Sequence, residues 1–92
     1  MCVVSYRWDE KKNAQLRMTR GVSFEQVVLH IEQGDVLALY AHPNHERYPN
    51  QHLLVVRMGD YAYLVPYVES IDGIFLKTII PSRKATRDFL GE

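Results

Sequence analysis

Two cations stand at a point of the sequence where an anion can be bound. A hydrophobic run that ends at Ile80 is followed by Pro81, which cannot continue a strand ladder, and by Ser82, which can cap a short helix. Arg83 and Lys84 are then the first residues of that helix, where backbone N–H groups are free and the helix dipole is positive. Because cations at this end cost roughly a few tenths of a kcal/mol, their presence favours a phosphate contact.

A second group of reactive side chains lies in the polar stretch 41–51, a loop between two expected strands. It contains His42, His45, Arg47 and Tyr48. Metal-free RNA cleavage needs a base for the 2′-hydroxyl proton, cations for the crowded phosphate and a group that protonates the leaving oxygen. Histidine suits proton transfer near neutral pH, so we predict His42 or His45 in this role and Arg83 as the phosphate clamp. The alternative is a polar loop whose histidines are incidental.

Further cations are predicted to hold an RNA backbone. They are Lys12, Arg17, Arg20, Arg47, Lys77 and Lys84. The formal net charge is zero, but residues 1–20 and 77–88 each carry net +3, whereas residues 21–76 carry net −5. If the two ends fold together, they form one basic patch that attracts nucleic acid. The plainer alternative is two solvated helix faces. No metal or cofactor is predicted, because no cysteine completes a ligand set with His42 and His45.

Two helices are expected in the first third of the chain, after a strand within residues 3–8. Asp9 is a good N-cap and Gly21 a good C-cap for the first helix. Ser23 and Gln26 form a capping box for the second helix, which Gly34 ends. The apolar stripe of this second helix consists of Phe24, Val27, Val28 and Ile31. Such a stripe has to be buried against another element.

The remainder of the chain has the pattern of β-strands. Strands are expected over 35–40, 53–58, 61–68 and 74–80, with a two-residue hairpin turn at 59–60. The apolar run 53–58 is typical of a central strand covered on both faces. Pro66 cannot donate to a ladder and predicts an edge position or a bulge. Tyr61, Tyr63 and Tyr67 share one strand face, which is expected to be core or a partner interface rather than a base-stacking surface.

The order of elements predicts a single α+β domain over residues 1–92. An N-terminal strand and two helices pack on an antiparallel four-strand meander, and a short C-terminal helix follows. With 47% hydrophobic and 24% charged residues, the composition is that of a globular protein. No apolar run approaches the roughly 20 residues of a membrane span, and the start is too soon charged for a signal peptide. Cys2 is the single cysteine, so a cytoplasmic location is expected.

Three segments of the chain resemble BrnT-type toxins, in the expected order. Residues 6–11 (YRWDEK), with Lys12 after them, are similar to the aromatic-x-Trp-Asp-x-x-Lys opening of that family. Residues 21–25 (GVSFE) are similar to its Gly-[Val/Ile]-Ser-Phe-Glu segment, and residues 81–86 (PSRKAT) to its Ser-Ala-Arg-x-Ala stretch after the last strand. The resemblance carries over a functional residue at Arg83.

The resemblance implies a RelE-like fold and the activity of a small ribonuclease toxin from a bacterial type II toxin–antitoxin pair. Such a toxin is an endoribonuclease that arrests growth by cleaving RNA. It implies a cognate antitoxin of ribbon-helix-helix type as partner, with operator DNA contacted only through that antitoxin. The alternative is a non-catalytic interaction module of the same fold, which binds an antitoxin-like partner through the face of Tyr61, Tyr63 and Tyr67.

Overall fold

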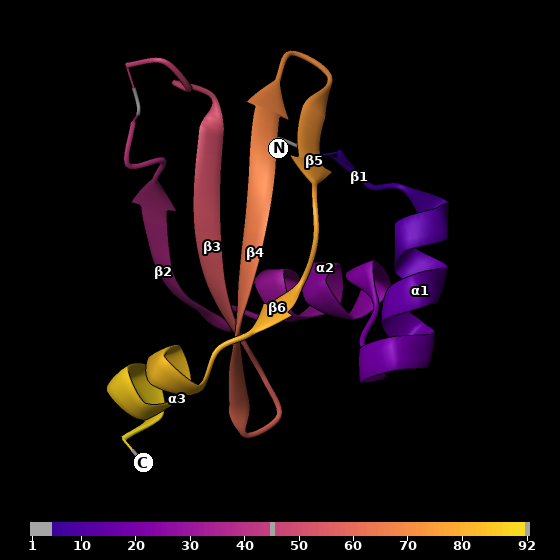
Figure 1. Ribbon diagram of the computed structural model, residues 1–92, viewed down its shortest axis with the longest axis vertical. Helices are drawn as coiled ribbons and strands as arrows, with labels where there is room; N and C mark the ends of the chain where they lie inside the picture. Colours follow the sequence, from indigo (N-terminus) through magenta and orange to yellow (C-terminus); the bar gives the residue numbers. More distant parts are fainter. Residues whose placement is uncertain (1–4, 45, 92) are drawn as a thin grey trace.

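In the computed structural model, which describes residues 5–44 and 46–91, the chain folds into a six-stranded sheet with helices on both faces (Figure 1). The elements in chain order are β1 (Tyr6–Arg7), α1 (Glu10–Arg20), α2 (Phe24–Glu32), β2 (Val36–Ala41), β3 (Gln51–Met58), β4 (Tyr61–Ser70), β5 (Gly73–Leu76), β6 (Ile80–Pro81) and α3 (Arg83–Leu90). The α+β class is confirmed. Part of the strand expected over 3–8 lies outside the described residues. In the described part of the chain, none of the helices is long and apolar enough to cross a membrane.

Strand pairing confirms the predicted meander. The order across the sheet is β1-β5-β4-β3-β2, and the neighbours from β2 to β5 are antiparallel. Gly59 and Asp60 form the predicted two-residue turn, because Met58 pairs with Tyr61. β1 joins the sheet in parallel to β5, through the pairs Tyr6–Ile74 and Arg7–Phe75.

The strand expected over 74–80 is interrupted opposite Pro66, for which the sequence predicts an edge position or a bulge. The edge position is wrong, but the pairing with β4 shifts by one residue between Tyr67–Leu76 and Leu64–Ile80, as it does at a bulge. Pro66 lies in β4, which is paired on both sides: with β3, and with β5 and β6. Lys77 donates its backbone N–H to the carbonyl of Pro66 at 2.9 Å. The return bond of an antiparallel pair is impossible because proline has no N–H. The missing donor therefore coincides with the gap between β5 and β6.

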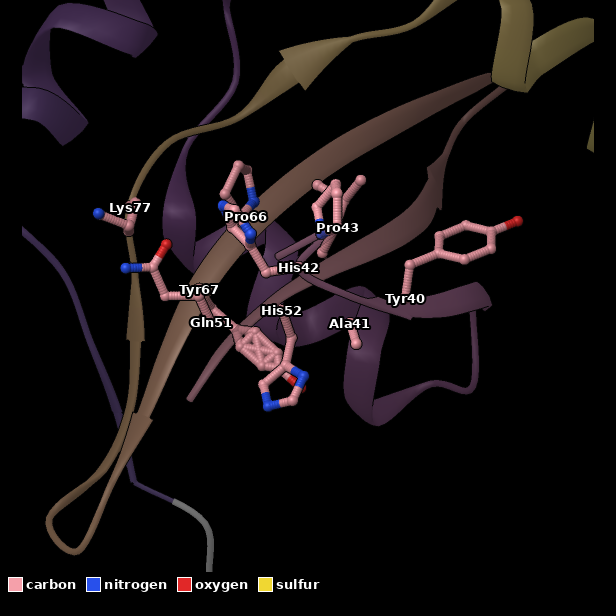
Figure 2. Close-up of a pocket in the computed structure, with 10 residues that line it drawn as sticks. Tyr40, Ala41, His42, Pro43, Gln51, His52, Pro66, Tyr67 and Lys77 are labelled. Carbon is pink, nitrogen blue, oxygen red and sulfur yellow. The ribbon is translucent and has the colours of Figure 1, made fainter. Parts of the chain in front are cut away.

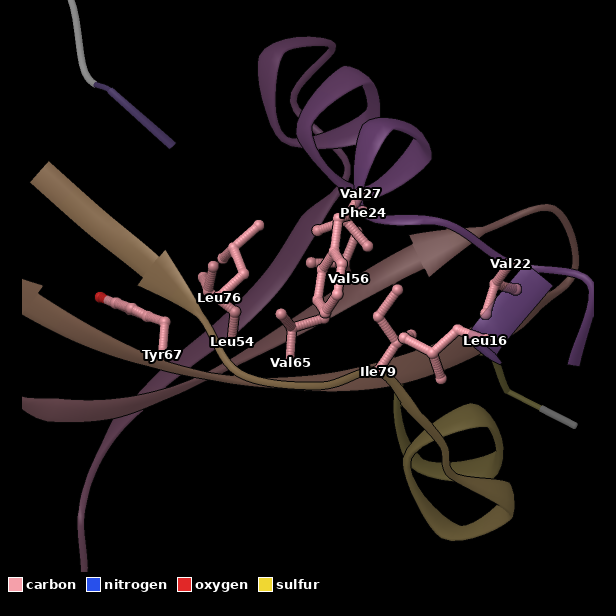
Figure 3. Packing of buried hydrophobic residues seen from close by; sticks show 10 residues of the cluster. All are labelled: Leu16, Val22, Phe24, Val27, Leu54, Val56, Val65, Tyr67, Leu76 and Ile79. Atoms are coloured by element: carbon pink, nitrogen blue, oxygen red, sulfur yellow. The ribbon is translucent and has the colours of Figure 1, made fainter. Parts of the chain in front are cut away.

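Two hydrophobic clusters lie on opposite faces of the sheet, because side chains alternate between the faces along each strand. The larger cluster consists of Leu16, Val22, Phe24, Val27, Leu54, Val56, Val65, Tyr67, Leu76 and Ile79 (Figure 3). The smaller cluster consists of Val55, Ala62 and Ala85. α1 and α2 thus cover one face through Leu16 and Phe24, and α3 covers the other through Ala85. Figure 3 shows α2 and α3 on opposite sides of the strands.

The helices begin at the predicted caps, and a buried side chain joins α1 to α2. The C-cap of α2 is Gln33, one residue before the predicted Gly34. Asp9 and Gly21 cap α1, and the capping box of Ser23 is present at the start of α2. Asn13 is 3% exposed. Its side-chain oxygen accepts the N–H of Phe24 at 2.8 Å, and its amide nitrogen donates to the carboxylate of Glu25 at 2.8 Å. Asn13 therefore satisfies a donor of the α2 N-terminus that has no partner within the helix.

Candidate functional site

A pocket of about 530 Å³ lies on the α3 side of the sheet, beside the loop that follows β2. It is lined by Tyr40, Ala41, His42, Pro43, Gln51, His52, Leu53, Pro66, Tyr67 and Lys77. Leu53 and Pro66 belong to the α3 side because their neighbours Leu54 and Val65 are in the larger core on the opposite face. Among the described residues, the side chains on this face of the lining include the cation Lys77 and His42 but no carboxylate. His52 also lines the pocket, but its ring lies on the opposite face, stacked on Tyr67. The chemistry of the lining therefore favours an anionic ligand that also has an apolar part.

One row of side chains crosses the floor of this pocket from strand to strand. Tyr40 is paired with Leu53, Leu53 is paired with Pro66, and the N–H of Lys77 is bonded to the carbonyl of Pro66. In Figure 2, Tyr40 and Lys77 lie at opposite ends of the pocket, with Pro66 and Pro43 between them. The row thus has an aromatic ring at one end and an ammonium group at the other. We call Tyr40, Leu53, Pro66 and Lys77 the Tyr40 row.

His42 is held in a defined orientation at the wall of the pocket. Its Nδ1 accepts the backbone N–H of Asn44 at 3.0 Å, and its ring lies 4.7 Å from the ring of Tyr48. The guanidinium group of Arg47 lies over the ring of Tyr48, 5.7 Å from the ring centre. Since Nδ1 accepts a hydrogen bond, the neutral ring carries its proton on Nε2 and presents a donor there. This arrangement suits binding of a phosphate oxygen rather than uptake of a proton at Nε2.

Arg83 and Lys84 begin α3 as predicted, but at a distance from His42. Ser82 accepts the N–H of Ala85 at 3.0 Å through its side chain, and donates its own N–H to Ala62 on β4 at 3.0 Å. His42 is bonded to Gln51, which is paired with Val68 of β4. Six residues of strand at about 3.3 Å each separate Ala62 from Val68, or about 20 Å. The structure does not bring the predicted clamp and His42 together, and Figure 1 shows α3 well away from the loop after β2.

The cations of α1 and those of α3 do not form one patch. α1 packs on the face opposite α3, so Lys12, Arg17 and Arg20 belong to the other side of the sheet from Arg83. Arg17 lies 3.1 Å from the carboxylate of Glu25, and Arg20 donates to the carbonyl of Ile79 at 2.9 Å. Both guanidinium groups thus have structural partners. His45, predicted as an alternative to His42, lies outside the described residues.

Two of the three tyrosines on the tyrosine face of β4 belong to the core, whereas Tyr61 is half-buried beside Tyr63, with 5.6 Å between the ring centres. Tyr67 is buried and Tyr63 packs against the same cluster under α1 and α2. Burial, and secondarily the carboxylate of Glu69 and the hydroxyl of Tyr6, raise the pKa of Tyr67. The hydroxyl therefore stays protonated near neutral pH. His52 stacks on Tyr67 with 5.2 Å between the ring centres, and its Nε2 lies 3.5 Å from Glu69.

Sequence reasoning did not select Tyr40, Arg7 or Phe75, which share the α3 side of the sheet with the pocket. Strand alternation was the available signal for Arg7, since its neighbour Tyr6 packs against the larger core. For Tyr40 and Phe75, strand alternation did not indicate the face. A bulge between Val36 and Ala38 shifts the register of β2, which carries Tyr40. The end of β5, which carries Phe75, depends on the pairing of Lys77 with Pro66. Comparison of the chain with protein-family models, curated proteins and solved structures finds no match in any of the three.

Proposed function

We propose that this protein is the toxin of a type II toxin–antitoxin pair, a metal-independent ribonuclease with a RelE-like fold that acts in the cytoplasm. The observation that carries the proposal is the pocket in which His42 and Lys77 meet an apolar floor without any carboxylate in the lining. The arrangement of two helices, an antiparallel meander and a C-terminal helix agrees with what the resemblance to BrnT-type toxins implies. A cognate antitoxin, of ribbon-helix-helix type, is the proposed partner.

In the proposed reaction the 2′-oxygen of one nucleotide attacks the neighbouring phosphorus, and the 5′-oxygen leaves. The ammonium group of Lys77 and the Nε2–H of His42 stabilise the negative charge that develops on the phosphate oxygens. The 2′-hydroxyl proton passes to a base, and the leaving oxygen takes up a proton. The sequence predicts His42 or His45 for proton transfer, and we assign the base to His45 because the neutral ring of His42 carries its proton on Nε2. Arg83 and Lys84 then hold the RNA backbone about 20 Å away, at the α3 end of the sheet, rather than the scissile phosphate.

A cleavage assay with purified protein and single-stranded RNA, in the presence of a chelator, tests this proposal. We expect cleavage by the wild type and a loss of about 100-fold or more in Lys77→Ala and His42→Ala, because each removes a group at the developing charge. Arg57→Ala is the matched control, since Arg57 is an exposed cation that bonds the carbonyl of Gly59 at 3.1 Å. A folded wild-type protein without cleavage, or full activity in Lys77→Ala, would contradict the proposal.

The alternative function is a non-catalytic interaction module. The separation of Arg83 and His42 favours this alternative. Arg83 begins α3 near Ala62 and His42 lies near Val68, and these two positions on β4 are about 20 Å apart, although both groups are expected to act on one phosphate. Because Tyr63 and Tyr67 are in the core, such a module would use the α3 side of the sheet and not the tyrosine face. Binding of the antitoxin encoded beside this gene, together with the absence of cleavage under all conditions, would support this alternative.

A further inference from the structure

Among residues 5–44 and 46–91, the helix α3 covers only part of its side of the sheet. α3 packs near Val55 and Ala62, at the end of β4 where the chain turns at Gly59 and Asp60. Beyond the pocket floor, toward the other end of β4, a second row of residues crosses the same face. Gln51 is paired with Val68, Val68 with Phe75, and Phe75 with Arg7. We call these four residues the Phe75 row, and the two rows together the open sheet face.

Each of the two rows has a cation at the same end. The Tyr40 row ends in Lys77 and the Phe75 row ends in Arg7, so both cations lie on the β5 side of the face. Between the cations and β2 the face is apolar except for Gln51: Phe75 is 41% exposed, and Leu53 and Pro66 are half-buried. The nearest acid of β4, Glu69, points to the opposite face, where it meets His52. The open sheet face thus combines an apolar floor with a cationic margin and has no acid in either row.

We propose that the open sheet face binds two consecutive unpaired nucleotides of RNA, with one base over each row and the phosphates along the cationic margin. The nature of the ligand rests on the proposed ribonuclease function, and the placement rests on strand register. Strands are about 4.8 Å apart, so Leu53 lies about 10 Å from Lys77, which leaves room for a base and its sugar between floor and ammonium group. Aromatic and apolar side chains on a sheet are a general platform for unstacked bases.

The geometry favours single-stranded RNA over other occupants. A duplex keeps its bases stacked inside, so it cannot place them on an apolar floor. An extended peptide adds to a sheet in the plane of its strands, at a free edge such as that of β2. The floor residues Leu53, Pro66 and Phe75 lie on β3, β4 and β5, which are paired on both sides, so a peptide added at the edge would not cover them. The positive margin without acids complements the phosphate charge of RNA.

Binding of a short fluorescent 2′-O-methyl oligonucleotide, measured by anisotropy, tests the placement apart from cleavage, because this probe lacks the nucleophilic hydroxyl. We expect Phe75→Ala to weaken binding about fivefold or more, through loss of stacking. Arg7→Gln and Lys77→Gln should each reduce the slope of log Kd against log salt by about 0.7. The controls are Phe89→Ala, on α3 and 39% exposed, and Arg87→Gln, which should leave both quantities unchanged. A duplex of the same sequence should bind more weakly.

The outcomes separate this inference from the proposed function. Binding that depends on Phe75 and Arg7, without cleavage of ordinary RNA, would retain the open sheet face and reject the ribonuclease. Cleavage that is unchanged in Phe75→Ala and Arg7→Gln would retain the ribonuclease and reject RNA binding at the open sheet face. If the probe does not bind, the placement is overturned. A change of oligomeric state in Phe75→Ala would then assign the face to a second copy, and a loss of antitoxin binding would assign it to that partner.

Discussion

The guanidinium group of Arg20 donates a hydrogen bond to the backbone carbonyl of Ile79 at 2.9 Å, although the two residues are 59 positions apart. This bond joins the last turn of α1 to the segment between β5 and β6. Ile79 is fully buried, and its segment lacks strand partners because of the gap that Pro66 leaves. Arg20 therefore supplies a donor to a carbonyl that the interrupted ladder does not use.

Arg20→Ala should lower the free energy of unfolding by about 1–2 kcal/mol, because it removes a charge-assisted hydrogen bond to that carbonyl. Chemical denaturation measures the change, with Lys11→Ala, an exposed position of the same helix, as control. A change within about 0.5 kcal/mol of the control would show that the bond adds nothing to stability. RNA binding measured on the folded variant would test separately whether Arg20 also contacts RNA.

Thr86→Val should destabilise the protein by about 1–3 kcal/mol, because it leaves a buried N–H without a partner. The hydroxyl of Thr86 accepts the N–H of Ala62 at 2.8 Å and donates to the carbonyl of Ser82 at 2.7 Å, which fixes α3 to β4. Thr19→Val is the matched control, since the hydroxyl of Thr19 bonds the carbonyl of Gln15 on an exposed surface. Equal thermal stability of the two variants would contradict a role of Thr86 in docking α3.

Gly73→Ala should cost about 3 kcal/mol or more, whereas Gly59→Ala should cost about 1 kcal/mol. Both glycines have positive φ, +125° and +69°, but an added Cβ meets only open space at Gly59. At Gly73 it would come within 2.3 Å of the carbonyl oxygen of Ser5, so β1 would have to move. Denaturation measures the costs, and oligonucleotide anisotropy should show weaker binding because Arg7 moves with β1. Similar costs for both variants would argue against this close approach.

The stability of the protein should fall at acidic pH in part through Glu25. A hydrogen bond from Asn13, one from a backbone N–H and the nearby Arg17 together lower the pKa of the Glu25 carboxyl below 4.5. The unfolded chain then binds more protons than the folded one, so this contribution is present above about pH 4.5 and is lost as the pH falls through the lower folded value.

Denaturation of the wild type and Glu25→Gln across this pH range checks the prediction. The difference in unfolding free energy should shrink as the pH falls, since glutamine does not titrate. Thr19→Val, which removes no titratable group from an exposed surface, is the control, and its difference from the wild type should not change with pH. A difference that stays constant with pH would mean that the Glu25 carboxyl has the same pKa in the folded and unfolded chain.

Local sequence patterns were sufficient for the helices, their caps and the hairpin turn. The capping box of Ser23 and Gln26, the caps Asp9 and Gly21, and the turn at Gly59 and Asp60 are each decided within a few residues. The chemistry of such motifs lies in backbone N–H groups and φ angles that neighbouring side chains satisfy directly. The order of the meander follows from the same information, because short connections favour antiparallel neighbours.

The tertiary structure alone decided which groups share a site. Pro66 interrupts the last strand only because the position of its missing N–H faces Lys77 across the sheet. The two residues are eleven positions apart, so a local sequence pattern does not predict this pairing. α3 packs opposite α1 because Ala85 meets Val55 and Ala62, so Arg83 lies far from His42 and on another face from Arg20. The sequence by itself determined the three helices, the turn at Gly59 and Asp60 and the approximate course of the strands, but not the division of the last strand into β5 and β6. Only long-range packing and register determined the face and the row on which each functional side chain lies, since these depend on contacts between segments remote along the chain.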